Sequence, residues 1–336
     1  MVPFLLGAVI VMAAVFAFLN GFRDVSSAVA LSVRTRALTP TLAVLLAGLF
    51  NCVGALLSVF LAVAFADRLF TVPPGGTGLI LLLAGLLGAC LWGVHQWWRG
   101  YPSSSTHALI SGLVGASLGS AVLGHPPLQG INASLLTLVV LPLLVSPVIA
   151  FALGFAAVYP TSWAFRNTAP GQAFRRTRQI QSVAAAAVAF GHGLQDGQRT
   201  TAVVLFALLA AGAGTAGSVP LWVPIFTAAA LTAGTLAGGW RISYTLGHRL
   251  VRLDPMRGFV AQLVAAGLLF VGAIGLALPL STTHTVTSAI AGAGRNQRFS
   301  VANGRVLRRI VWMWVATPVA CAFLGALFFL ALSPLA

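Results

Sequence analysis

The stretches Phe18-Leu-Asn-Gly-Phe-Arg-Asp24 and Phe190-Gly-His-Gly-Leu-Gln-Asp196 decide how this chain folds. Their aspartates lie 172 residues apart, and both stretches sit in otherwise apolar sequence. A second pair, Pro102-Ser-Ser-Ser-Thr-His107 and Pro279-Leu-Ser-Thr-Thr-His284, repeats in the same order with an offset of 177 residues. Two motifs that repeat at nearly equal offsets indicate a duplicated structural unit.

The composition is that of a membrane protein. Of 336 residues, 59% are hydrophobic and 7% are charged, and the mean hydropathy is +0.97, which excludes a soluble fold. The net charge of +15 comes from 19 arginines set against four aspartates. Short arginine-bearing loops between apolar segments are the positive-inside pattern, so we expect contact with anionic membrane lipids and no nucleic-acid partner.

The uncharged segments predict an all-α polytopic membrane protein located in the cell membrane. They have room for six spans and two shorter apolar pieces. We expect each half to contain a broken helix through its Asp motif, two further spans and a re-entrant helical hairpin with the Ser/Thr-His motif at its tip. Three crossings per half make the second half inverted. The predicted repeats are residues 1–165 and 179–336, joined by a basic linker at 166–178.

The arginine distribution supports this arrangement. Fifteen of the 19 arginines fall in four loops that the inverted repeats place on one side, around Arg34 and Arg36, 166–178, 241–257 and 295–309. That side is predicted to be cytoplasmic, with both termini outside. Within 241–257, Ile242, Leu246, Leu250 and Leu253 at helical spacing predict an amphipathic helix on the inner surface.

The aspartates of the first motif pair are candidate cation ligands. An ionisable residue inside a span is costly and marks a substrate or ion path. Gly21 and Gly193 each precede an aspartate by three residues, and we expect the helices to unwind there and expose carbonyls beside Asp24 and Asp196. The alternative is that each aspartate only caps a helix, with Asp24 paired to an arginine.

The second motif pair has the outline of an anion site. A helix N-terminus offers free N–H groups and a positive dipole end, and clustered hydroxyls add donors that suit a tetrahedral oxyanion. The hydroxyls are those of Ser104, Ser105, Thr106, Ser281, Thr282 and Thr283. His107, His284 and His192 are candidates for relaying protons or orienting groups, although packing histidines bonded to backbone explain the first two as well.

At these residues the chain resembles the inorganic phosphate transporter (PiT) family. The similar stretches are Asn20 to Val29, Thr35 to Leu38, Pro102 to His107, His192 to Arg199, Gly239 to Ile242, Leu253 to Phe259 and Leu280 to His284. The resemblance implies an inverted-repeat carrier, a homodimer, that moves phosphate with a coupling cation near the bilayer midplane. It assigns phosphate contacts to the six hydroxyl residues and to Gln198, and cation or metal contacts to Asp24 and Asp196.

Four departures from the family bear on the coupling ion. Arg23, Ser27 and Gln195 stand where relatives usually have Asn, and Arg99 stands where they have an apolar residue. If Arg23 fills the first cation site and Arg99 lies near the anion, Asp196 with Gln195 can still accept a proton or one ion. We therefore expect H+ coupling rather than Na+ coupling, and no cofactor.

Several functions compete with phosphate import. Sulfate is another tetrahedral oxyanion, but only phosphate offers a proton to Asp24 and Asp196 at neutral pH. A metal–phosphate complex is a further form of the substrate. An intramembrane hydrolase is disfavoured because the Ser/Thr-His set occurs twice within single motifs. A channel is disfavoured because the sequence does not indicate a wide polar pore. ATP-driven transport by this chain is disfavoured because the sequence contains no P-loop.

Overall fold

The computed structural model describes residues 1–129, 140–215, 217–276, 278–297 and 302–335, and part of the expected loop 295–309 lies outside them. The predicted all-α fold is confirmed, because most of the described residues are helical and the β-structure among them is one isolated bridge, between Thr71 and Gln129. The first half contains α1 (Val2–Arg34), α2 (Pro40–Leu57), α3 (Val59–Leu69), α4 (Gly76–Arg99), α5 (Ser105–Val122), α7 (Leu141–Ala156) and α8 (Val158–Ala164). The second contains α9 (Pro170–Ala210), α10 (Trp222–Ala237), α11 (Trp240–Tyr244), η2 (Thr245–Leu250), α12 (Pro255–Phe270), η3 (Val271–Gly275), α13 (Thr282–Arg295), α14 (Gly304–Leu332) and η4 (Ser333–Leu335).

Helix starts follow local sequence signals. Thr39 accepts a hydrogen bond from the Leu42 N–H just before Pro40 opens α2, and Asp254 accepts one from the Arg257 N–H before Pro255 opens α12. A capping oxygen satisfies an N–H of the first turn, and proline fits there because it has no N–H to lose. These short-range rules position the helices that carry the site.

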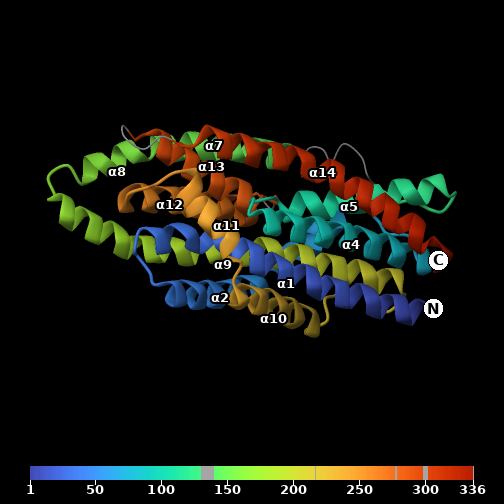
Figure 1. The fold of residues 1–336 in the computed structure, drawn as a ribbon. Coiled ribbons are helices and arrows are strands. Elements are labelled where there is room, and N and C mark those ends of the chain that lie inside the picture. The colour runs from blue at the N-terminus through green and yellow to red at the C-terminus, as the bar shows by residue number, and fades with distance from the viewer. Residues whose placement is uncertain (130–139, 216, 277, 298–301, 336) are drawn as a thin grey trace.

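The long helices α1 and α9 run side by side along the molecule (Figure 1). Both are continuous through their Asp motifs, so the predicted break at Gly21 and Gly193 is wrong. The residues of the expected linker from Pro170 onward are likewise the first turns of α9. The two glycines serve close packing instead of unwinding. A Cβ at Gly21 would lie 2.0 Å from the Leu231 carbonyl oxygen, and one at Gly193 would lie 2.3 Å from the Asn51 carbonyl oxygen.

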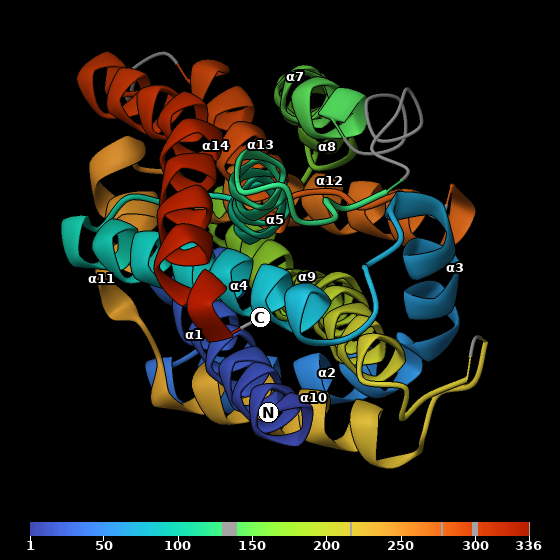
Figure 2. The ribbon, with the colours of Figure 1, turned by 90° about the vertical axis from the view of Figure 1, so that its right-hand side faces the viewer.

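Packing between the halves is reciprocal. The helix α1 of the first half packs on α10 of the second, and α9 packs on α2. In the same way α5 packs on α14 and α13 packs on α7. Figure 2 shows α5 beside α14, and α1 and α9 lying above α10 and α2. This exchange of partners is what two structurally equivalent halves related by a pseudo-twofold axis would show, and the inversion itself stays a prediction.

The two hairpins occupy opposite ends of the molecule. Figure 1 shows α4 and α5 in the half that holds both chain termini, and α12 and α13 in the other half. Figure 2 shows both termini on the end that faces the viewer. Residues 100–104 and 278–281 connect the hairpin helices, and these connections carry the two Ser/Thr motifs. Which end is cytoplasmic stays a prediction.

The protein is a multi-pass membrane protein. Among the described residues, six helical segments are long and apolar enough to cross a membrane, and a seventh results if α10 is joined across a 57° bend to α11 and η2. The six are Val2–Arg34, Pro40–Leu57, Gly76–Arg99, Leu141–Ala164, Pro255–Gly275 and Gly304–Leu335.

The polar centre lies between two buried apolar clusters. In α1, Leu5 to Phe16 contribute to one cluster and Val25 to Leu31 to the other. In α9, Ala184 to Ala189 belong to the second cluster and Ala202 to Ala210 to the first. The polar residues of the Asp motifs fall between these stretches on both helices, so apolar packing above and below fixes their position.

Candidate functional site

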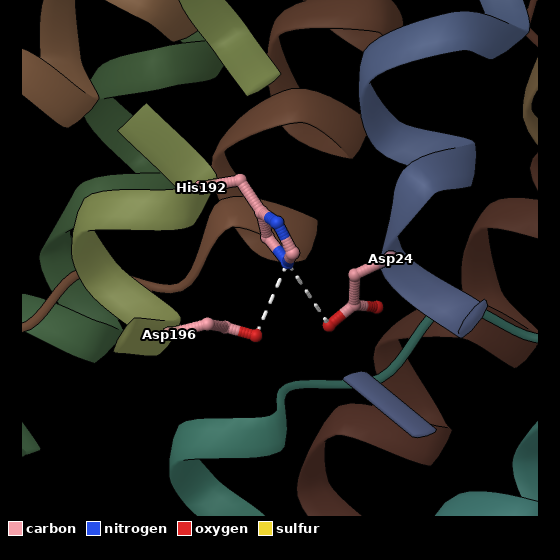
Figure 3. Close-up of side chains that lie close together, drawn as sticks. All are labelled: Asp24, His192 and Asp196. Carbon is pink, nitrogen blue, oxygen red and sulfur yellow. Dashed lines mark ion pairs between the residues drawn. The ribbon is translucent and has the colours of Figure 1, made fainter. Parts of the chain in front are cut away.

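Asp24, His192 and Asp196 form a buried group, here called the carboxylate–histidine cluster (Figure 3). The ring nitrogen Nε2 of His192 lies 3.1 Å from Oδ2 of Asp196 and 4.0 Å from Oδ2 of Asp24. His192 and Asp196 are one turn apart on α9, and Asp24 reaches them from α1. All three side chains are at most 3% exposed. The two Asp motifs, far apart in sequence, therefore meet in one site.

A hydrogen-bond chain orients the His192 ring. Its Nδ1 lies 3.0 Å from the side-chain oxygen of Asn51, whose amide nitrogen donates to Thr235 at 2.9 Å. The hydroxyl of Thr235 donates in turn to the Leu231 carbonyl at 2.9 Å. Because the Asn51 oxygen can only accept, Nδ1 carries a hydrogen. The Nε2 atom then faces the two carboxylates, where it can take up a proton and share it with Asp196.

Arg199 connects the cluster to the first hairpin. Its guanidinium is ion-paired with Asp196 and donates to the hydroxyls of Thr106 and of Ser105, the latter at 3.2 Å. Its Nε donates to the Gln195 carbonyl at 2.8 Å, which fixes the side chain along α9. The side chain is only 1% exposed. A buried guanidinium is retained in such a place because a carboxylate and several acceptors surround it.

The second hairpin contacts the cluster without such an intermediary. The hydroxyl of Thr283 donates directly to Oδ1 of Asp24 at 3.2 Å. Thr283 and Thr106 are equivalent positions of the repeat, as are Asp24 and Asp196. In the first pair the carboxylate is therefore hydrogen-bonded directly to the hydroxyl. In the second pair a guanidinium lies between the carboxylate and the hydroxyl. The two half-sites differ in where their buried guanidinium lies: Arg199 stands between carboxylate and hydroxyl, whereas Arg23 is bonded to Ser103 of the hairpin.

Ser104 and Ser281 act as helix caps. The Ser104 hydroxyl accepts the His107 N–H at 3.2 Å, and the Ser281 hydroxyl accepts the His284 N–H at 3.2 Å. Thr282 is buried and its hydroxyl has no protein partner among the described residues. The free N–H groups and hydroxyls at the starts of α5 and α13 thus gather at two helix N-termini beside the cluster.

Arg23 and Gln195 hold the hairpin tips. Arg23 donates to the Ser103 carbonyl at 3.1 Å and to its hydroxyl at 3.0 Å. Gln195, the matching position, donates to the Leu278 carbonyl and accepts the Leu280 N–H, both at 3.3 Å. None of the ion pairs among the described residues joins Arg23 to Asp24, although the buried Arg23 charge acts on Asp24 electrostatically. That Arg23 fills the first cation site stays a prediction. The guanidinium points to the hairpin because Gly93 of α4 leaves room for it.

The remaining predicted residues differ in their placement. Arg99 is exposed at the end of α4, so its predicted place beside the anion is wrong: Arg199 supplies the buried positive charge instead. Gln198 and Ser27 are buried near the aspartates on α9 and α1, and their roles stay predictions. The rings of His107 and His284 lie 5.0 Å apart, and His284 stacks on Trp314 at 4.0 Å, which favours the packing interpretation.

Arg199, Asn51 and Ser103 take part in the site although the sequence motifs predict no role for them. Arg199 follows Asp196 by three residues, a helical spacing at which an arginine and an aspartate readily pair, so this contact is predictable from the sequence. Asn51 and Ser103 reach the site from α2 and from the first hairpin connection. Nothing in their local sequence indicates which helix they would face.

The site can also be tested as a cation site. One ligand atom from each of Asp24, His192 and Asp196 lies within 4.8 Å of the others, so the three residues fit a small cation. Hard cations such as Na+ prefer oxygen ligands, whereas His192 presents a nitrogen. Asp196 is also already ion-paired with Arg199. The donor set thus combines two carboxylates, one of them already ion-paired, with one imidazole nitrogen.

Comparisons with known proteins identify the family of the chain. Residues 20–325 match the model of the phosphate transporter family, PHO4. The chain is 38% identical over 332 residues to the "Probable low-affinity inorganic phosphate transporter" of Rhizobium meliloti (strain 1021), covering 98% of this chain and 96% of that protein. It is 34% identical over 320 residues to the protein of the same name from Bacillus subtilis (strain 168), covering 95% and 94%.

A solved structure described as the sodium-dependent phosphate transporter superimposes with a TM-score of 0.84 at 21% identity, covering 98% of this chain and 99% of that one. At this identity the likeness shows a shared fold. The family match extends over both Asp motifs and both hairpin motifs, and the relatives align along nearly the whole chain. The chain therefore belongs to the phosphate transporter family.

Proposed function

We propose that this protein is a secondary active transporter that imports inorganic phosphate with a coupling cation, and that the cation is H+ rather than Na+. The family and the names of its relatives support phosphate as the substrate. The observation that carries the mechanism is the buried carboxylate–histidine cluster with Arg199, placed against the starts of α5 and α13.

Phosphate binds between the two hairpin tips in this proposal. The His107 and His284 rings are neighbours, so the helix starts that precede them converge. Their N–H groups and hydroxyls suit the oxygens of a tetrahedral anion. Arg199 adds a guanidinium that binds phosphate through two hydrogen bonds once it leaves Thr106.

The geometry of the carboxylate–histidine cluster favours a proton as the coupling ion. Asp24 and Asp196 together carry two negative charges, and the buried guanidinium groups of Arg199 and Arg23 return two positive charges, so the group is balanced while His192 is neutral. A proton on Nε2 of His192 needs no new ligands and is held by Asp196 at 3.1 Å. The positive charge that it adds is favourable when an anion such as phosphate is bound beside it. Phosphate brought in together with that proton has its charge partly compensated.

Two alternatives are less well supported. Sulfate would fit the same hydroxyls but provides no proton to the cluster at neutral pH. Hydrolysis would need a serine positioned by a separate base, yet Ser104 and Ser281 are engaged as caps of their own helices. The relatives are named as transporters, which is not an enzymatic function.

Transport by purified protein in liposomes tests the proposal. Uptake of labelled phosphate is measured with an inward proton gradient, with an inward sodium gradient at constant pH, and with neither. We expect accumulation with the proton gradient alone, competition by unlabelled phosphate and little competition by sulfate. Strong stimulation by sodium at constant pH would refute H+ coupling and leave phosphate transport intact.

Two further parts of the proposal need their own measurements. Chelation of divalent metals during the assay distinguishes free phosphate from a metal–phosphate complex, because only the complex loses uptake. The homodimer implied by the family resemblance is tested by the mass of the detergent-solubilised protein. A monomer that transports at the full rate would contradict it.

A further inference from the structure

Two cavities adjoin on the surface of the protein where α4, α10 and α11 meet. The first, here called the basic cavity, has a volume of about 440 Å³ and is lined by residues that include Trp98, Arg99, Arg241 and Arg249. The second, here called the apolar groove, has about 400 Å³ and is lined by Val44, Leu45 and Leu236 among others. Trp240 lines both. The surface thus offers a positively charged compartment that continues into an apolar one.

Two of the three arginines of the basic cavity, Arg241 and Arg249, lie over aromatic rings. The Arg241 guanidinium lies 4.5 Å from the ring centroid of Trp98 and donates to the Trp98 carbonyl at 3.0 Å. The Arg249 guanidinium lies 5.1 Å from the ring of Tyr244. Within the described part of the chain, no acidic side chain lines either cavity. Three positive charges therefore converge without a carboxylate from the lining to neutralise them.

The amphipathic pattern of α11 and η2 forces these arginines outward. Ile242, Leu246 and Leu250 are each at most 1% exposed, because they pack against the core. Arg241 and Arg249 lie on the opposite, exposed face. Gly247 of η2 packs against Ala30 and Arg34 at the end of α1, which places the basic cavity toward the end remote from the chain termini. That end is the one predicted to be cytoplasmic.

We infer that the basic cavity and the apolar groove together bind one anionic phospholipid, with its phosphate in the basic cavity and an acyl chain in the apolar groove. Guanidinium groups bind phosphate through paired hydrogen bonds, and basic pockets between helices on the cytoplasmic side suit anionic headgroups. Trp98 and Trp240 are amphipathic aromatics of the kind that settle at headgroup level. Free phosphate would use the basic cavity but would gain nothing from the apolar groove.

A purely structural role accounts for only part of this arrangement. Arg241 donates to a carbonyl at the C-terminal end of α4, where a cation is favourable in any case. Arg99 and Arg249 are exposed and line the same cavity, and an uncompensated charge next to the lipid-facing Leu45 and Leu236 is costly unless it reaches a headgroup. A bound anionic lipid accounts for all three arginines and for the groove beside them.

Native mass spectrometry of the full-length protein with added lipid tests the inference. Wild-type protein is expected to retain phosphatidylglycerol with one preferred site and to release phosphatidylcholine. The Arg99→Gln/Arg249→Gln variant should lose roughly tenfold in affinity for phosphatidylglycerol, because two charge-assisted contacts are removed. The control is Arg166→Gln, because Arg166 is an exposed arginine that lies over an aromatic ring, Trp163, at 4.2 Å, as Arg249 lies over Tyr244, but outside the cavity. The control should retain the lipid.

Two further arms separate the outcomes. Phosphatidylglycerol with short acyl chains should bind more weakly than the long-chain form, and inorganic phosphate should not displace the long-chain lipid. Equal retention by wild type and the double variant, or no preference over phosphatidylcholine, would overturn the inference. Displacement by inorganic phosphate with no effect of chain length would assign the basic cavity to free phosphate instead. If the double variant fails to fold, Arg99→Gln alone is used, because Arg99 is exposed and caps no helix end across the cavity.

Discussion

Arg199 lies between Asp196 and Thr106, whereas at the equivalent positions of the repeat Asp24 is bonded directly to Thr283. A repeat with this much internal correspondence would be expected to build two equal half-sites. The inserted guanidinium makes them unequal, because Asp196 is directly ion-paired with an arginine and Asp24 is not. The difference bears directly on how many cations the transporter can take.

Replacing Arg199 with Gln should create a need for an added cation. Without the guanidinium, Asp24 and Asp196 face each other across His192 with one positive charge fewer, and breaking such a buried pair costs about 3–5 kcal/mol. The variant should therefore melt at a lower temperature than wild type in sodium-free buffer and regain stability as sodium is added, through binding to the folded state. Thermal unfolding at several sodium concentrations measures this. Arg199→Lys keeps the charge and should show no sodium response, and a response as large as that of Arg199→Gln would contradict the charge argument.

His192 is expected to carry the coupled proton. In His192→Gln the side chain cannot take up a proton, so accumulation driven by a pH gradient should disappear while exchange of internal for external phosphate continues. Parallel measurements of net uptake and of exchange in the same liposomes separate the two. Loss of both activities in a folded variant would make His192 part of the anion site, and loss of neither would remove it from the mechanism.

The hairpin hydroxyls should separate into caps and ligands. The Ser105→Ala/Thr282→Ala variant loses two donors, and hydrogen bonds to a charged group are worth about 1.5–3 kcal/mol each, so phosphate affinity should fall at least roughly tenfold. Ser104→Ala should instead cost about 1 kcal/mol of stability through the lost cap, and Ser104→Asn should recover it. Phosphate binding by calorimetry and thermal unfolding distinguish the two effects. Unchanged affinity in the folded double variant would exclude these hydroxyls from the site.

The glycine of the first Asp motif should be intolerant of a side chain. A Cβ at Gly21 would lie 2.0 Å from the Leu231 carbonyl oxygen, and overpacking of this kind costs roughly 1–3 kcal/mol. Gly7 lies in the same helix with no atom within 4 Å of its would-be Cβ, so Gly7→Ala is the matched control and should be neutral or stabilising. The comparison is made by thermal unfolding in detergent. Equal effects of the two substitutions would mean that α1 and α10 are not in backbone contact.

The orientation of the chain can be tested by labelling introduced cysteines in whole cells. Ser218 and Gln172 are both exposed, and they lie in segments predicted to be on opposite sides of the membrane. An impermeant thiol reagent should label a cysteine at Ser218 and not one at Gln172. The native Cys52, Cys90 and Cys321 are at most partly exposed and give the background. Labelling of Gln172 alone would reverse the predicted topology.

The parts of the site that can be predicted from sequence are those that the repeat makes visible. The matching motifs pair Asp24 with Asp196, and the structure brings these residues to either side of His192. The Ser/Thr motifs are predicted at hairpin tips, and they lie there. Both predictions succeed because a charge or a run of hydroxyls inside apolar sequence is costly unless it serves a site.

The wrong predictions concern contacts with residues that are far away in the sequence. Unwinding is the predicted role of Gly21 and Gly193, but close backbone contact with another helix demands glycine equally, and nothing in the local sequence separates the two causes. The side chain of Arg23 could reach either Asp24 or the hairpin, and the space beside Gly93 of α4 decides for the hairpin. Arg99 lies close to Pro102 in sequence, yet the chain turns at Gly100 and leaves it on the surface.

The exchange of partners between the halves has a consequence for their origin. Gly21 of α1 meets its backbone partner in α10, and Gly193 of α9 meets its own in α2, so neither long helix is covered by helices of its own half at these crossings. A polypeptide corresponding to one half alone would expose the glycine-bearing face of its long helix, together with a carboxylate that is buried in the full chain. Such a polypeptide could persist only by associating with a second copy. On the predicted duplication, the two ancestral chains would already have depended on each other, and their joining would allow one copy to acquire Arg199 without the other.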